Sequence, residues 1–384
     1  MTAFPNALAE EIWRTRYRFH PPGEAPEPSI DASWERVARA LAAVEEADRS
    51  AWQRRFNDAL ADFRFLPGGR ILAGAGTGRR VTLFNCFVMG QVDDSMDGIF
   101  NALREGALTL QQGGGIGYDF SPLRPAGEAT DASGGTASGP VSFMHVWDAM
   151  CATVQSAGAR RGAMMATLRC DHPDIETFIA AKRQPGALTR FNLSVLVTDA
   201  FLHAIDAGTE WPLVFPAEGA GRHMLRKVRA RELWESIVET AFECAEPGVI
   251  FIDRVRALDN LGYAERIGAT NPCGEIPLPP YGACDLGSLN LTRFIAHPFT
   301  PQAKLDTAAL GETARVAARM LDNVYDVSGF PLPQQAHAAR ASRRIGLGIT
   351  GLADALVMLG LSYDDPRARR VASDAMRTVT EAAY

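Results

Sequence analysis

The sequence has little of what marks a secreted, disulfide-stapled or nucleic-acid-binding protein. Its 384 residues include only 6 cysteines, which excludes a disulfide scaffold and predicts reduced thiols. The 39 basic residues are outnumbered by 45 acidic ones. No long basic tract could follow a phosphate backbone, so we expect no nucleic acid as a partner.

Long hydrophobic runs and metal-binding spacings are also lacking. No window approaches the roughly 18 uninterrupted apolar residues of a membrane span, and the first residues have no signal-peptide core. We therefore expect no membrane partner and a cytoplasmic location. Neither CxxC nor HExxH occurs, so no metal site of the usual zinc spacings is expected.

Two kinds of hydrophobic pattern divide the chain. Up to about residue 65 apolar residues recur at helical steps, as in Trp34, Val37 and Leu41 and again in Phe56 and Leu60. Beyond that point short apolar runs alternate with helical patterns. This alternation favours an α/β architecture with a largely parallel sheet or barrel.

Capping residues and prolines predict where several elements begin. Asp94 or Ser95 can cap one helix, Pro140 starts another, and Asp199 caps a third after the strand TRFNLSVLVTD. The basic stretch MLRKVRARELW predicts the solvated start of a further helix. The last residues, MRTVTEAAY, stop inside a helical pattern without a cap, so we expect the chain to be cut short.

Three cysteines differ from the others in their surroundings. Cys273 lies in ATNPCGEIPLPPYGACDLGSLNL, a Pro- and Gly-rich stretch that predicts a shaped loop. If the backbone there is extended, its period of two puts Asn271, Cys273 and Glu275 on one face. Cys284 follows in the same stretch, and Cys86 belongs to the apolar run VTLFNCFVM, a predicted buried strand. We interpret the remaining three as structural thiols: Cys151, Cys170 and Cys244.

Glycine-rich segments offer two further candidate sites. GGGIG at 113–117 follows a helical pattern and lacks the GxGxxG spacing, so close approach of the backbone to a ligand or another strand is favoured over a dinucleotide site. SAGARRGAMM presents Arg160 and Arg161 between glycines. Two guanidiniums suit phosphate or base recognition, and surface salt bridges are the alternative.

Ten motifs, in this order, closely resemble the catalytic chain of ribonucleotide reductases: FNCFVM, DDSMDGIF, GGGIGYDFSPLRP, SGPVSFM, ARRGAMM, DHPDIETFI, FNLSVLVTDAF, GVIFID, NPCGEIPL and GSLNLTRF. The NPCGE form resembles the adenosylcobalamin-dependent class. The resemblance implies a ten-stranded α/β barrel, incomplete in this chain, with a finger loop at 271–285 in its centre. It assigns 66–384 to the barrel and 1–65 to a helical region before it.

The resemblance also implies catalytic roles. Cys273 is similar to the thiyl-radical site that abstracts the 3′ hydrogen of the ribose, Glu275 to the base at the 3′ hydroxyl, and Asn271 to the amide that binds the ribose hydroxyls. Cys86 and Cys284 resemble the dithiol that supplies two electrons and ends as a disulfide. Adenosylcobalamin would initiate the radical.

Substrate and effector positions follow from the same comparison of motifs. The implied substrate contacts are Gly69, Arg70, Asn85 and Gly115, and the implied contacts to a nucleotide effector, a dNTP or ATP, are Asp94, Ser95, Arg124, Arg160 and Arg161. Many relatives have NSPTL where this chain has GGRIL at 68–72, which leaves di- and triphosphate substrates open.

The expected partners are a ribonucleotide, a deoxynucleotide effector, an external thiol reductant such as thioredoxin, and a second copy in a homodimer. Two alternatives stand beside this reading. One is a large subunit whose radical comes from a separate metal-containing subunit. The other is a split subunit or a non-catalytic nucleotide-binding fragment. We expect this segment alone to be inactive.

Overall fold

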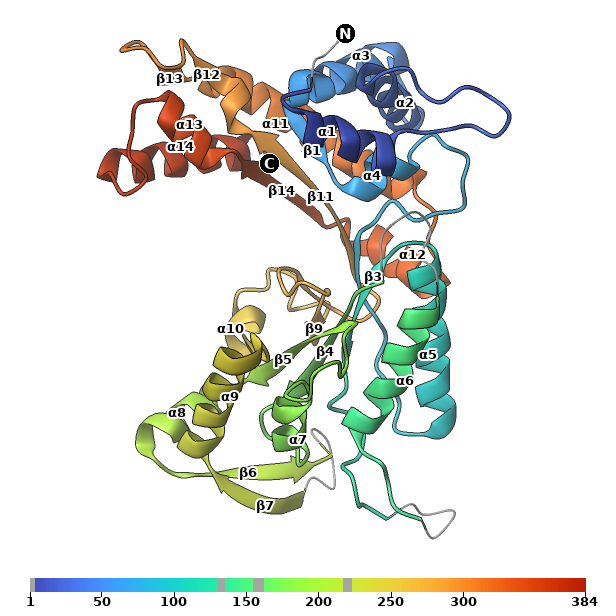
Figure 1. The fold of residues 1–384 in the computed structure, drawn as a ribbon, viewed down its shortest axis with the longest axis vertical. Helices are drawn as coiled ribbons and strands as arrows, with labels where there is room; N and C mark the ends of the chain where they lie inside the picture. The colour runs from blue at the N-terminus through green and yellow to red at the C-terminus, as the bar shows by residue number, and fades with distance from the viewer. Residues whose placement is uncertain (1–3, 130–134, 155–161, 217–222) are drawn as a thin grey trace. The chain divides into compact units, whose positions relative to one another are not determined.

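The computed structural model describes residues 4–129, 135–154, 162–216 and 223–384. The chain divides into two compact units (Figure 1). The first comprises 1–85, 284–330 and 339–384, and the second 86–283 and 331–338. Each is described by itself.

The first unit is mainly helical with a small mixed sheet. Its helices are α1 (Ala7–Ile12), η1 (Trp13–Tyr17), α2 (Ile30–Ala42), α3 (Arg49–Leu60), η2 (Ala61–Phe63), α4 (Gly69–Gly74), η3 (Leu291–Phe294), α11 (Thr307–Val327), α13 (Leu352–Met358) and α14 (Pro366–Ala383). Its strands are β1 (Phe65–Pro67), β11 (Ala283–Asn290), β12 (Ile295–Ala296), β13 (Lys304–Leu305) and β14 (Ile345–Thr350). Helix α12 (Pro333–Ser342) contributes residues to both units.

Strand β11 is the middle of that small sheet. It pairs antiparallel with β1, with Phe65 opposite Leu289, and parallel with β14, with Asp285 opposite Ile345. Its first three residues are all buried, and from Asp285 onwards burial alternates, as the two-residue period of a strand predicts. Asp285 is one of the buried residues, with 1% of its surface exposed.

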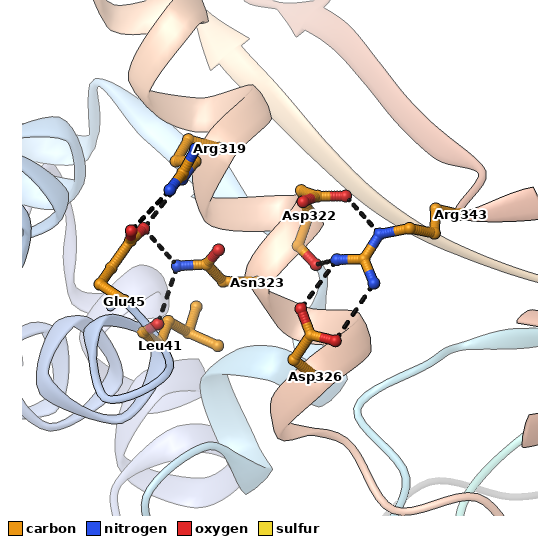
Figure 2. A network of polar contacts seen from close by, with 7 residues as sticks. All are labelled: Leu41, Glu45, Arg319, Asp322, Asn323, Asp326 and Arg343. Atoms are coloured by element: carbon orange, nitrogen blue, oxygen red, sulfur yellow. Dashed lines mark hydrogen bonds and ion pairs between the residues drawn. The ribbon is translucent and has the colours of Figure 1, made fainter. Parts of the chain in front are cut away.

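Paired charges surround helix α11 (Figure 2). The buried Glu45 accepts hydrogen bonds from Arg319 Nε and Nη2, at 2.9 and 2.6 Å, and from Asn323 Nδ2 at 2.8 Å. Asp322 and Asp326, also on α11, accept hydrogen bonds from Arg343. The hydrogen bonds from Arg319 hold the pKa of Glu45 below its usual value, and those from Arg343 do the same for Asp326.

The second unit is built on five parallel strands in the order β2, β3, β4, β5, β8. These strands are β2 (Cys86–Val88), β3 (Gly115–Asp119), β4 (Met164–Arg169), β5 (Phe191–Val197) and β8 (Gly248–Phe251). Helices connect them: α5 (Met96–Gln111), α6 (Pro140–Thr153), α7 (Ile175–Ala180), α8 (Asp199–Ala207), α9 (Ala230–Cys244) and α10 (Ile252–Ala257). Two antiparallel hairpins complete it: β6 (Glu210–Phe215) with β7 (His223–Arg229), and β9 (Ala269–Thr270) with β10 (Pro277–Leu278).

Local sequence explains why α5 begins where it does. Ser95 is its N-cap, and the Ser95 hydroxyl accepts a hydrogen bond from the amide of Gly98 at 3.0 Å. Ile99, Ala102 and Leu110 are buried at helical spacing. Figure 1 shows α5 and α6 side by side next to β3.

Two predicted local features are wrong. The cap of α8 is Thr198, whose side chain accepts from the amide of Phe201, and Asp199 is the first helical residue. The first six residues of MLRKVRARELW, 224–229, were expected to start a helix but belong to strand β7, and α9 begins only at Ala230. Pairing with β6 satisfies the backbone of this exposed basic segment, which its own side chains could not predict.

None of the helices described is long and apolar enough to cross a membrane. Among the same residues no three His, Cys, Asp or Glu side chains gather in a way that could hold a metal ion.

Candidate active site

The first part of the predicted finger loop, 271–285, forms the turn of the β9–β10 hairpin, residues 269–278, which we call the finger hairpin. Its loop closes on itself, because the amide of Gly274 donates to the carbonyl of Asn271 at 3.1 Å and Gly274 adopts a φ of +85°. The extended face predicted from the two-residue period is therefore wrong. Asn271 is fully buried, whereas Cys273 and Glu275 are exposed.

Asn271 fastens this loop internally and to strand β2. Its Oδ1 accepts hydrogen bonds from the amide of Ile276 at 3.0 Å and from the hydroxyl of Thr270 at 3.1 Å. Its Nδ2 donates to the sulfur of Cys86 at 3.2 Å. The structure thus joins two of the predicted catalytic residues directly.

The finger hairpin lies against the parallel sheet at a position that needs glycine. A Cβ added at Gly117 of β3 would overlap the carbonyl oxygen of Thr270. The interpretation that the 113–117 glycines allow close backbone approach is confirmed at this residue. Asn192 Nδ2 donates to the carbonyl of Pro272 at 2.6 Å, so β5 also holds the hairpin.

Cys86 lies at the start of β2, where its predicted partners on neighbouring elements converge. It is buried, and in the parallel register it stands opposite Gly115, one of the predicted substrate contacts. Cys86, Gly115 and Asn271 therefore form one cluster within the second unit.

Cys284 belongs to the first unit and is also buried. Its sulfur donates to the backbone carbonyl of Asp285 at 3.2 Å. Both carboxylate oxygens of Asp285 are buried without a hydrogen-bond partner among the residues described. Burial raises the pKa of this carboxyl well above its usual range.

The remaining thiols differ from Cys273 in exposure. Cys151 and Cys170 are buried, and burial raises their pKa values to about 11 and about 12. Cys244 is partly buried in α9. Within the described residues neither the thiol of Cys273 nor the carboxylate of Glu275 has a hydrogen-bond partner, so both are available to a ligand.

Three predicted substrate contacts meet at the start of α4 in the first unit. Gly69 and Arg70 are its first residues, and the amide of Arg70 donates to Asn85 Oδ1 at 3.3 Å. A side chain at position 69 would press against the hydroxyl of Tyr17.

The predicted effector residues also come together, in front of α5. Arg124 donates to the Asp94 carboxylate through its amide at 3.0 Å and its Nε at 2.8 Å, and Ser95 caps the helix. Both side chains of this ion pair are about a quarter to a third exposed. Arg160 and Arg161 lie outside the described residues.

A cavity of about 560 Å³ adjoins the finger hairpin at the carboxyl ends of the parallel strands. Ala269 of the hairpin and the preceding Gly268 form part of its wall, and Asp119 and Arg169 line it from β3 and β4. Its volume lies within the roughly 300–1,000 Å³ typical of small-molecule sites. Its other lining residues are Val88, Met89, Gly90, Gln91, Ser121, Pro122, Leu196, Pro216, Ile252, Arg256, Arg266 and Pro280.

Sequence reasoning missed several residues of this site. Asn192 carried no signal, because its role depends on a hydrogen bond to a residue 80 positions away. No sequence pattern indicated the arginines of the cavity wall either, because they lie in unrelated segments of the chain. Gly117 alone had a signal, the glycine run itself.

Comparison with known proteins gives two family matches. A family described as "Ribonucleotide reductase, barrel domain" matches residues 84–384, and one described as "Ribonucleotide reductase, all-alpha domain" matches residues 3–80. The predicted order, a helical region followed by a barrel of this type, is confirmed.

Individual relatives agree with these matches. A protein of Mycobacterium tuberculosis named "Vitamin B12-dependent ribonucleoside-diphosphate reductase" is 42% identical over 98% of this chain and 54% of its own length. One of the same name from Thermoplasma acidophilum is 37% identical over 86% of this chain and 42% of its own. A Chlamydia trachomatis "Ribonucleoside-diphosphate reductase subunit alpha" is 29% identical over 86% and 34%. The chain spans about half the length, or less, of these relatives.

Proposed function

Because this chain belongs to the ribonucleotide reductase family, we propose that its finger hairpin carries the radical thiol of an adenosylcobalamin-dependent reductase of ribonucleoside diphosphates. The diphosphate and the cofactor are taken from the names of the M. tuberculosis and T. acidophilum relatives. The observation that carries the proposal is the hydrogen bond that ties the hairpin's Asn271 to the sulfur of Cys86.

In this proposal the exposed residues of the turn act on the substrate ribose. Cys273, as a thiyl radical, removes the 3′ hydrogen, and Glu275 takes the proton of the 3′ hydroxyl. We assign Asn271 to the ribose hydroxyls, and this role requires its buried side chain to exchange hydrogen bonds within the turn for hydrogen bonds to the substrate. Exposure of Cys273 and Glu275 suits groups that must reach a ligand.

Two further thiols supply the electrons and protons that the reaction consumes. Loss of the 2′ hydroxyl as water and its replacement by hydrogen consume two electrons and two protons. We assign these to Cys86 and Cys284, which end as a disulfide, and an external dithiol such as thioredoxin then reduces it. The carbon-bound 3′ hydrogen returns from Cys273, so this residue is regenerated.

The cavity beside the hairpin fits part of the proposed cofactor. Its size and mixed lining, apolar Val88 and Leu196 with polar Asp119 and Arg169, suit a nucleoside-sized group and not a whole corrinoid. When bound, adenosylcobalamin would supply the one-electron oxidation of the Cys273 thiol. The hairpin wall at Gly268 and Ala269 joins this cavity to the loop that bears Cys273.

We propose regulation by a deoxynucleotide or ATP at Asp94, Ser95 and Arg124. An ion pair beside a capped helix start offers both a carboxylate for a sugar hydroxyl and a guanidinium for phosphate. Met96 and Phe100, on one face of α5, are 60% and 48% exposed. We assign this apolar face to contact with a second copy in a homodimer.

The phosphates of the substrate are assigned to the start of α4. There Gly69 and Arg70 replace the residues of the more usual motif, and Asn85 fixes the backbone of Arg70. Because the proposed substrate, effector and reductant are cytoplasmic compounds, we expect the protein to act in the cytoplasm.

The test is an anaerobic assay of the intact enzyme with a ribonucleoside diphosphate and a dithiol. We expect deoxynucleotide only when adenosylcobalamin is added. Product that instead requires a metal-loaded partner subunit would support the separate-radical-subunit alternative. Effector binding without reduction under any of these conditions would favour a non-catalytic nucleotide-binding chain.

A further inference from the structure

Tyr281 stands where the chain leaves the finger hairpin and is held in a conformation that costs energy. It lies between β10 and β11 with a φ of +62°, a left-handed value that residues with a side chain rarely adopt. Its ring occupies the space beside Gly90, because a Cβ at that position would overlap the phenol. Something must compensate for this strain.

The compensating contact is a hydrogen bond to helix α5. The Tyr281 hydroxyl donates to Glu105 Oε2 at 3.0 Å, and Glu105 is only 7% exposed. Burial and the neighbouring carboxylate raise the pKa of Tyr281 to about 12, so the hydroxyl keeps its proton at neutral pH. The hydroxyl therefore remains a hydrogen-bond donor to Glu105 at neutral pH.

Glu105 lies on the same helix as the proposed effector residues. It is ten residues beyond the Ser95 cap, which corresponds to about 15 Å along a helix. A helix moves as a rigid rod over that length, so a shift at its capped end reaches Glu105. On the other side, Tyr281 is only three residues from Leu278 of β10.

We propose that the Tyr281–Glu105 hydrogen bond makes Tyr281 a positioning residue, which transmits the state of α5 to the finger hairpin and so to Cys273. The inference rests on the proposed function and deepens it, because it states how a nucleotide at Asp94 alters the reacting thiol. A physical link between two sites is not in itself coupling, so the test must measure coupling.

The test compares Tyr281→Phe with a matched control, Tyr118→Phe. The first keeps the ring beside Gly90 and removes only the bond to Glu105. The second removes another tyrosine hydroxyl bonded to α5, from Tyr118 to the carbonyl of Ala102 at 2.6 Å, but Tyr118 belongs to β3. Both remove a tyrosine hydroxyl bonded to α5, and only the first removes a direct bond between α5 and the segment that continues the hairpin.

We expect Tyr281→Phe to keep its kcat/KM without effector within about twofold while the stimulation by effector falls at least about fivefold, the lower end of typical coupling. Tyr118→Phe should keep that stimulation. Glu105→Gln retains an acceptor for the Tyr281 hydroxyl, so this variant should keep most of the stimulation by effector. Hydrogen exchange of residues 269–283 should slow on effector binding in the original protein and not in Tyr281→Phe.

Three results would overturn the inference. Stimulation unchanged in Tyr281→Phe would show that the bond transmits nothing. An equal fall in rate with and without effector, or an equal loss in Tyr118→Phe, would reduce Tyr281 to a structural role. An original protein that reduces ribonucleotides but ignores every nucleotide would instead reject the proposed effector site, and this inference with it.

Discussion

Polar groups are handled differently around α11 and in the finger hairpin. Around α11 the buried and half-buried carboxylates accept hydrogen bonds from other side chains, as Glu45 does from Arg319 and Asn323 (Figure 2). In the hairpin the hydrogen bonds involve the backbone and Asn271, and the side chains of Cys273 and Glu275 are exposed. Saturated charges indicate a structural role, and reactive groups on a rigid, well-bonded turn indicate chemistry.

The largest effect is expected when the finger hairpin is displaced from its position against β3. Gly117→Ala places a methyl group on the carbonyl of Thr270, so the hairpin must move. We expect turnover to fall by at least about 100-fold, as for a 1 Å misplacement of reacting groups. Gly348→Ala in β14 is the control, because the nearest atom to its added methyl group, the hydroxyl oxygen of Ser288, lies at an ordinary 3.8 Å. Equal activity of the two variants would contradict the seating argument.

Removing a saturated charge should affect stability and leave chemistry unchanged. Glu45→Gln loses the charged hydrogen bonds to Arg319, and we expect the free energy of unfolding at pH 7 to fall by about 1.5–3 kcal/mol. Because the pKa of Glu45 is lowered by folding, this contribution is present above the unfolded value of about 4.3 and is lost as the pH falls through the folded value. Urea denaturation at several pH values measures both.

The matched control for that change lies on α11, the helix that carries Arg319, the partner of Glu45. Glu312 pairs with Arg315 in an exposed contact at 2.7 Å, and Glu312→Gln should change stability by less than about 0.5 kcal/mol. If the two variants lost equal stability, the distinction between saturated and surface charges on α11 would fail.

Asp285→Asn sharpens the comparison through the pH dependence of stability. This carboxyl is the exception in the first unit, buried with no partner among the described residues. Its pKa is raised on folding, so the folded state holds the proton more tightly and stability falls as the pH rises above about 3.9, the unfolded value. The variant should escape this loss and gain relative stability towards pH 8. A difference independent of pH would mean that Asp285 is charged in the folded protein.

The sequence predicted what depends on neighbours along the chain. The Ser95 cap and the strand before Thr198 have local causes and were found, and the glycine run indicated Gly117 although its contact, Thr270, is distant in the chain. What depends on distant partners was missed: the bond from Tyr281 to Glu105 spans 176 residues, and β7 is a strand because β6 pairs with it. The face predicted for Asn271, Cys273 and Glu275 failed because Gly274 lets the loop turn.

The most direct test of the central claim is to follow the thiols through one turnover. The intact enzyme, with adenosylcobalamin and a ribonucleotide but no external reductant, is stopped with an alkylating reagent and mapped by mass spectrometry. We predict product limited by the internal dithiol, Cys86 joined to Cys284, and Cys273 alkylated as a regenerated thiol. A disulfide that contains Cys273, or product with Cys86 and Cys284 still reduced, would contradict the account.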